Sequence, residues 1–246
     1  ASTFDTALLH FLSVIHHRQF IMTSTSSLPF SSDPYGLKPG EVSTGTTIMA
    51  MPFDGGVVLG ADTRTSTGVY VANRTSDKIA QLSTHIFCCR SGSAADTQAL
   101  SDYVKYYLST IELETGQPPL VKVAAHLMRK LAYENKDQLM AGVIIAGWDP
   151  VHGGQVFNIP LGGSLIEMPF ALGGSGSTYI YGMIDSEYRE NMNQEETRTL
   201  VKKVISHAMA RDGSSGGCIR TVVVTEHGND RDYTPGNQLP YGPAGW

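Results

Sequence analysis

The sequence predicts an α+β fold, most simply two packed β-sheets covered by helices. Short apolar runs separated by glycines come first, and two stretches of helical periodicity follow. The strand pattern then returns before a further helix and a last strand. Strands therefore group with strands and helices with helices, which is typical of α+β proteins.

The first predicted elements are two strands joined as a hairpin. Residues 46–53 and 57–62 are mainly apolar and flank an Asp-Gly-Gly segment at 54–56. Asp-Gly suits a tight turn between antiparallel strands. Two shorter runs, 79–82 and 86–89, continue the strand pattern.

Helices are predicted next. Apolar residues recur at helical spacing between residues 100 and 111, and again between 121 and 131 after a pair of prolines. Strands are then expected at 142–148, 155–159 and 164–170, because these runs are bounded by Asp-Pro and Gly-Gly breaks.

The last third of the chain begins with a glycine-rich turn at 173–177, which is expected to lead into a short helix around 179–183. Glu195 opens a longer amphipathic helix whose apolar pairs share one face. The last expected strand is 219–225, and an irregular Pro- and Gly-rich tail is expected from about residue 227.

Composition excludes several classes of protein. Lys and Arg number 18 against 23 Asp and Glu, so no excess of positive charge is available for nucleic acid. No apolar run approaches the ~20 residues of a membrane helix, so no membrane partner is expected. The three cysteines match neither a disulfide framework nor a metal site, and a reducing compartment with no metal or cofactor is expected. Cys88 and Cys89 are interpreted as small core residues that alternate across a strand.

The chain changes character near residue 45. Residues 1–45 are rich in Ser, Thr and Pro and have little apolar periodicity to bury. We expect 1–45 to be a removable propeptide and 46–246 to form a single domain. Residues 7–15 lack the basic flank of a secretory signal.

A removable leader followed by Thr46 suggests a mechanism. Cleavage would expose a hydroxyl and an α-amine on one residue. Because an α-amine has an ordinary pKa of about 7.7–8.0, it can act as general base for the adjacent hydroxyl near neutral pH. This pairing is a known variant of the catalytic triad.

Three further residues fit such a site. Lys78 begins a predicted strand, and if buried near Thr46 it would lower the pKa of the hydroxyl and the amine, with Asp62 orienting it. The backbone N–H of Gly92 is a candidate oxyanion donor. By residue type alone, an Asp in the place of Asp62 is more often a turn or cap residue, and a Lys in the place of Lys78 is more often solvated.

A more specific signal is carried by six segments that follow one another along the chain: Gly45-Thr46-Thr47-Ile48, Gly60-Ala61-Asp62-Thr63-Arg64, Ser76-Asp77-Lys78-Ile79, Arg90-Ser91-Gly92-Ser93-Ala94-Ala95-Asp96, Gly173-Gly174-Ser175-Gly176-Ser177 and Ala210-Arg211-Asp212-Gly213-Ser214-Ser215-Gly216-Gly217. Between about Gly45 and Thr225, the sequence resembles a catalytic β-subunit of the eukaryotic core proteasome, most similar to the caspase-like, acid-preferring type.

The resemblance implies a fold and a set of catalytic residues. The fold is the four-layer αββα sandwich of N-terminal nucleophile hydrolases, with two antiparallel sheets. Thr46 becomes the nucleophile once the chain itself cuts the Gly45–Thr46 bond. The residues implied around it are Asp62, Lys78, Gly92, Ser175, Asp212 and Ser215.

Arg90 is the predicted specificity residue. It lies two residues before Gly92 on one strand, so both share a face, and its guanidinium would favour acidic substrates in the adjoining pocket. The alternative is a surface arginine paired with a neighbouring acid. The other pocket positions implied by the resemblance are Thr65, Ser66, Ser76, Ala80 and Ala94.

The resemblance implies a threonine endopeptidase in the cytoplasm and nucleus, assembled with other α and β subunits into stacked seven-membered rings. Its substrates would be unfolded, ubiquitin-tagged polypeptides, and regulatory caps would act on it indirectly. A non-catalytic ring subunit and a metabolic N-terminal nucleophile amidohydrolase are the alternatives. The joint presence of Thr46, Asp62 and Lys78 argues against the first, and the strings at 90–96 and 212–217 argue against the second.

Overall fold

The computed structural model describes residues 45–67 and 70–242. The expected propeptide, apart from Gly45, lies outside these residues. No helix in the described part of the chain combines the length and apolar character needed to cross a membrane.

The first sheet is antiparallel and has five strands. In spatial order they are β10 (Ala171–Gly173), β1 (Ile48–Phe53), β2 (Gly56–Asp62), β11 (Ile219–Thr225) and β12 (Gly228–Thr234). The predicted hairpin is confirmed, with Phe53 opposite Gly56 at the turn and Ile48 opposite Ala61 at the far end.

The second sheet is also antiparallel and five-stranded. Its order is β5 (Ile79–Ser83), β6 (Ile86–Gly92), β7 (Ala141–Asp149), β8 (Gly153–Ile159) and β9 (Ile166–Glu167). A separate two-stranded ribbon, β3 (Thr65–Thr67) and β4 (Tyr70–Asn73), was not predicted, because strands of three and four residues are too short to show an alternating pattern.

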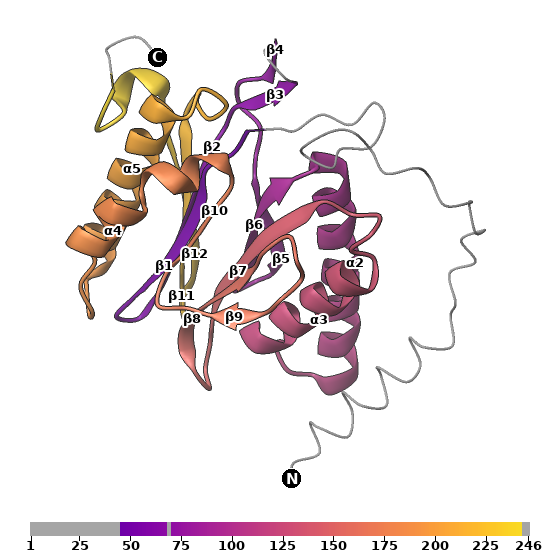
Figure 1. The fold of residues 1–246 in the computed structure, drawn as a ribbon. Coiled ribbons are helices and arrows are strands. Elements are labelled where there is room, and N and C mark those ends of the chain that lie inside the picture. The colour runs from indigo at the N-terminus through magenta and orange to yellow at the C-terminus, as the bar shows by residue number, and fades with distance from the viewer. Residues whose placement is uncertain (1–44, 68–69, 243–246) are drawn as a thin grey trace, which may run out of the picture. The chain divides into compact units, whose positions relative to one another are not determined.

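Helices cover the outer faces of both sheets (Figure 1). The second sheet carries α2 (Ala94–Thr115) and α3 (Val121–Glu134), and the first carries α4 (Tyr181–Glu187) and α5 (Gln194–Arg211). Helix α2 is capped by the Ser93 hydroxyl, and α5 begins with a reciprocal capping box between Asn193 and Glu196. Short 3₁₀ turns lie at Ser175–Tyr179 and Gly236–Gln238.

Three apolar layers hold the four structural layers together. Successive residues of β1 point into different apolar layers. Met49 packs toward α5, whereas Ile48 packs between the two sheets. In β6, Cys88 packs toward α2 and α3 and Cys89 between the sheets, which confirms their interpretation as core residues. Burial raises the pKa of the Cys88 thiol to about 11. The αββα sandwich is therefore confirmed.

Two expectations about strands are wrong. Of the expected strand at 164–170, only Ile166 and Glu167 form a strand, β9, which pairs with β8; after Pro169 the chain enters β10 at Ala171, which pairs with β1 in the other sheet. Proline cannot donate to a sheet ladder, so it marks the point where the chain crosses between sheets.

The irregular tail was expected from about residue 227, but Gly228–Thr234 form the edge strand β12, paired along its length with β11. Its sequence Gly-Asn-Asp-Arg-Asp-Tyr-Thr gives no hydrophobic alternation. Ion pairs hold it instead, since Asp230 and Asp232 reach Arg198 and Lys202 on α5 at 2.7 and 2.6 Å.

Candidate active site

Thr46 and Gly45 lie buried just before β1, and the side chain groups around them converge on one carbonyl oxygen. The Thr46 hydroxyl donates to the Gly45 carbonyl oxygen at 2.8 Å, and Lys78 Nζ donates to the same oxygen at 3.0 Å. Thr46 is 3% exposed. The hydroxyl therefore lies beside the Gly45–Thr46 peptide bond, whose carbonyl the lysine polarises.

Lys78 is held by the carboxylate of Asp62. Its Nζ lies 2.7 Å from Asp62 Oδ1, with both side chains almost completely buried. Burial lowers the pKa of the Lys78 ammonium from its ordinary value, while the charges of Asp62 and Asp212 act in the opposite direction. A lysine with a lowered pKa can exchange a proton more readily than an exposed one.

Backbone donors fix the Asp62 carboxylate. The N–H groups of Thr47 and Gly216 donate to Asp62 at 2.8 and 3.0 Å, and Arg64 N–H donates at 3.2 Å. Burial raises the pKa of the Asp62 carboxyl, and these donors together with Lys78 oppose that rise. Asp62 is thus a satisfied buried acid, rather than a solvated turn residue.

A second network surrounds the Thr46 nitrogen. Ser175 Oγ and Ser215 Oγ both donate to Asp212 Oδ2, at 2.7 and 2.6 Å. With its proton directed at Asp212, the Ser175 oxygen accepts the Thr46 N–H at 3.2 Å. The Thr47 hydroxyl lies 2.8 Å from Ser215 Oγ and completes the network.

Asp212 occupies an electrostatically unfavourable place, directly after the C-terminus of α5. The negative end of a helix dipole disfavours a carboxylate there. Two serine hydroxyls and the Ser214 N–H, which donates to Oδ1 at 3.0 Å, compensate for this. An acid retained in such a place is consistent with a role in the site.

Two positions of the site have no space for a side chain and are therefore occupied by glycine. A Cβ on Gly45 would collide with the side chain and backbone of Ser214. A Cβ on Gly174, whose φ is 80°, would collide with the Thr46 carbonyl oxygen. Glycine before Thr46 therefore lets the peptide bond approach the loop that follows Asp212.

The structure thus brings most of the predicted catalytic residues together, from segments distant in sequence. Ser66 also reaches the junction, where its Oγ accepts the Gly45 N–H at 3.5 Å. Gly92 ends β6 opposite Ala141. Its assignment as the oxyanion donor remains a prediction.

The predicted specificity residues form a second group. Thr65 and Ser76 share a hydroxyl hydrogen bond of 2.8 Å. Arg90 donates from Nη2 to the carbonyl oxygen of Asp77 at 2.9 Å. Ala80 packs partly buried against the core beneath α2, and Ala94 is exposed at the first position of α2.

Reasoning from the sequence missed the groups that hold the candidate catalytic side chains: the Thr47 hydroxyl and the backbone N–H groups of Thr47, Arg64, Gly216 and Ser214. Backbone donors carry no residue-type signal. Thr47 could have been found from its position beside Thr46. Among the described residues, no group of three or more His, Cys, Asp or Glu could hold a metal ion.

This arrangement has the groups required for acyl transfer. A hydroxyl lies beside a polarised carbonyl, a buried lysine can exchange a proton, and a serine–aspartate network contacts the nitrogen of the same threonine.

Comparison with known proteins gives the family. Residues 42–224 match the family model described as "Proteasome subunit". The chain is 55% identical over 197 residues to proteasome subunit beta type-6 of Arabidopsis thaliana, covering 80% of this chain and 84% of the relative. It is 53% identical to beta type-1 of Saccharomyces cerevisiae (79% and 90% covered) and 49% identical to beta type-9 of Homo sapiens (82% and 92% covered).

Proposed function

Because the chain belongs to the proteasome subunit family, we propose that it is a catalytic β-subunit of the core particle, a threonine endopeptidase with preference for cleavage after acidic residues. It cuts its own chain at Gly45–Thr46. Afterwards it degrades unfolded, ubiquitin-tagged polypeptides.

The observation that carries this proposal is the environment of the Gly45 carbonyl. Its oxygen accepts hydrogen bonds from the Thr46 hydroxyl and the Lys78 ammonium. A purely structural subunit has no need of a buried lysine aimed at the bond before its first strand, since burying that charge is costly. The geometry supports a bond that is prepared for attack.

The self-cleavage proceeds in two steps. Thr46 Oγ attacks the Gly45 carbonyl carbon, and Lys78 stabilises the negative charge that develops on the oxygen. The hydroxyl proton passes through neighbouring groups to the departing Thr46 nitrogen as the C–N bond breaks, which leaves an ester. Water then hydrolyses the ester, releasing the Gly45 carboxylate and a free Thr46 amine.

The same residues serve peptide hydrolysis once the amine is free. Ser175, held by Asp212, lies 3.2 Å from the Thr46 nitrogen and orients it. The amine takes the proton of the hydroxyl, and Thr46 Oγ attacks the substrate carbonyl with Lys78 and Asp62 beside it. The Gly92 N–H is proposed as the donor to the substrate oxyanion.

Arg90 provides the preference for acidic residues. Among the described residues no carboxylate forms an ion pair with its guanidinium, which is bound to a neutral carbonyl group instead. Its charge is therefore available to a substrate carboxylate.

The subunit assembles with other α and β subunits of the core particle, as proteasome β-subunits do. We place it in stacked seven-membered rings in the cytoplasm and nucleus. Confinement within a ring would keep the nucleophile away from folded proteins.

The test compares hydrolysis of two matched peptides, with Glu or its neutral isostere Gln before the scissile bond, by the assembled particle. Thr46→Ala should abolish the activity of this subunit on both peptides, because the nucleophile is lost. Arg90→Ala should lower kcat/KM for the Glu peptide by about ten- to a hundredfold and leave the Gln peptide nearly unchanged, since a charge-assisted pair contributes about 1.5–3 kcal/mol.

Thr115→Ala provides the control, because the side chain of this exposed threonine at the end of α2 bonds, among the described residues, only to Ile111 and Gln117 and should leave both rates unchanged. Full hydrolysis by Thr46→Ala would refute the threonine mechanism. An unchanged Glu preference in Arg90→Ala would refute the pocket assignment alone.

A further inference from the structure

Three arginines converge on the loop that precedes Lys78. Arg90 on β6 donates to the carbonyl oxygen of Asp77 at 2.9 Å, and Arg220 on β11 donates to that of Thr75 at 3.0 Å. Arg231 on β12 binds the Asp77 carboxylate, with Nη1 3.2 Å from Oδ2. This loop of the second sheet is therefore held partly by side chains of the first.

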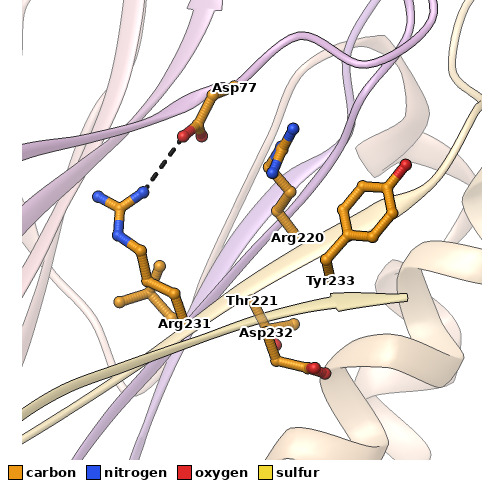
Figure 2. A pocket seen from close by; sticks show the side chains of 7 residues that line it. Asp77, Arg220, Thr221, Arg231, Asp232 and Tyr233 are labelled. Atoms are coloured by element: carbon orange, nitrogen blue, oxygen red, sulfur yellow. Dashed lines mark hydrogen bonds and ion pairs between the residues drawn. The ribbon is translucent and has the colours of Figure 1, made fainter. Parts of the chain in front are cut away.

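Asp77 uses separate atoms for separate partners. Its Oδ1 accepts the N–H of Ile79, two residues along the chain, at 2.9 Å. Such a local bond fixes the loop conformation and hence the direction of the Asp77 carbonyl. Oδ2 faces Arg231, as Figure 2 shows, so the carbonyl alone is left for Arg90.

Arg231 is itself held in place. Its guanidinium lies 5.3 Å from the centre of the Phe87 ring, a core residue between the sheets. With Asp77 and Arg220 it lines a cavity of about 100 Å³, in which Arg231 points toward Asp77 and Arg220 stands beside Tyr233 (Figure 2). Arg231 therefore presents a fixed positive charge to the Asp77 carboxylate.

Arg90 thus contacts the carbonyl group of Asp77, while the carboxylate of Asp77 is bound to Arg231. A neutral carbonyl orients its guanidinium without cancelling its charge, whereas a carboxylate at the same place would neutralise it. The carboxylate best placed to do so belongs to Asp77, the residue that Arg90 already contacts.

We propose that Asp77 is a positioning residue for Arg90, and that Arg231 keeps the Asp77 carboxylate engaged so that the charge of Arg90 stays available for an acidic substrate side chain. The inference rests on the proposed function and extends it to two residues that do not touch substrate.

The experiment measures KM and kcat of the assembled particle for the Glu and Gln peptides described above. Arg231→Gln frees the Asp77 carboxylate to pair with Arg90. We expect KM for the Glu peptide to rise about threefold, the scale of a partly exposed ion pair, with kcat and both Gln constants unchanged.

Adding Asp77→Asn to Arg231→Gln should restore the wild-type KM for the Glu peptide, because the amide keeps the Oδ1 acceptor but has no charge to compete. This rescue separates the proposed role from a structural one. Arg231→Lys, which retains the charge, should behave like the wild type.

A second comparison serves if Arg231→Gln does not assemble. Asp77→Ala removes the acceptor for the Ile79 N–H and releases the carbonyl, so KM for the Glu peptide should rise, whereas Asp77→Asn alone should leave it unchanged. Asp230→Asn is the matched control, since Asp230 also pairs with an arginine, Arg198, but within the described residues it forms no hydrogen bond or ion pair with this loop.

Equal effects of Arg231→Gln on both peptides, no effect on either, or a double variant that stays impaired would overturn the inference while leaving the peptidase intact. A wild-type particle without Glu preference, or an Arg90→Ala variant that keeps it, would overturn the inference together with the proposed specificity.

Discussion

Lys78 connects the bond to be cut with the buried carboxylate that supports it. Its ammonium donates both to the Gly45 carbonyl oxygen and to Asp62. Burial lowers its pKa, and the adjacent negative charges keep it from falling further. We therefore propose that this one side chain stabilises the developing oxyanion in self-cleavage and exchanges a proton in hydrolysis.

Replacing Lys78 by Ala should therefore stop both reactions. We expect a subunit that retains residues 1–45 and hydrolyses neither peptide, as measured by intact mass and by the peptidase assay. The matched control is Lys203→Ala, because this lysine is partly exposed and pairs with Glu187 at 2.8 Å, away from the site. A processed, active Lys78→Ala subunit would show that the lysine is dispensable.

For single residues, the sequence indicates which side chains belong to the candidate site but not which backbone groups bind them. Thr46, Asp62 and Lys78 could be proposed from residue type, order and resemblance. The backbone N–H groups of Gly216 and Thr47, which donate to Asp62, could not be proposed in this way. Nearly every residue has a backbone N–H, and only folding brings residue 216 close to residue 62.

Individual elements show where apolar periodicity succeeds as a signal and where it fails. Strands β1, β2 and β11 and helices α2, α3 and α5 bury regular apolar faces and were predicted. Strand β12 was missed, because it is fixed by backbone pairing and by ion pairs to α5. The ion pairs join residues about 30 positions apart in the sequence, so a local pattern cannot indicate them.

The Asp232–Lys202 pair of this edge strand gives a pH-dependent prediction. The hydrogen bond from Lys202 lowers the pKa of the Asp232 carboxyl below its ordinary value of 3.8. The pair therefore stabilises the fold fully above pH 3.8, and this contribution is lost as the pH falls through the lowered pKa.

Asp232→Asn should accordingly lower the free energy of unfolding at pH 7 by about 0.5 kcal/mol or less, since water screens this partly exposed pair. The difference from the wild type should shrink toward zero in acid. Urea unfolding of the full chain between pH 7 and pH 3 measures it. A difference that stays constant over this range would mean that packing, and not charge, accounts for the effect.

On the scale of the whole molecule, the candidate site draws its residues from both sheets and from the end of helix α5. Asp62 ends a strand of the first sheet, Lys78 precedes a strand of the second, and Asp212 follows the long helix α5. Thr46 lies just before β1, and its neighbours make the connections: Lys78 bonds to Gly45, Asp62 bonds to Thr47, and Asp212 bonds to Ser175, which accepts the Thr46 N–H. Activity is therefore expected to depend on the complete fold.

The same placement explains why the reactive bond is buried. With Gly45 attached, the Thr46 nitrogen is an amide and cannot act as a base, so the uncut chain is inactive by chemistry as well as by access. Cutting the junction converts the amide into the required amine. The central claim is that this cut occurs at Gly45–Thr46 and depends on Thr46.

The most direct test is the intact mass of the subunit isolated from the assembled particle, for the wild type and for Thr46→Ala. We expect a wild-type chain that begins at Thr46 and a variant chain that still carries residues 1–45. A wild-type chain in an active particle that retains these residues or begins elsewhere would contradict the central claim, as would a Thr46→Ala chain cut at the same bond.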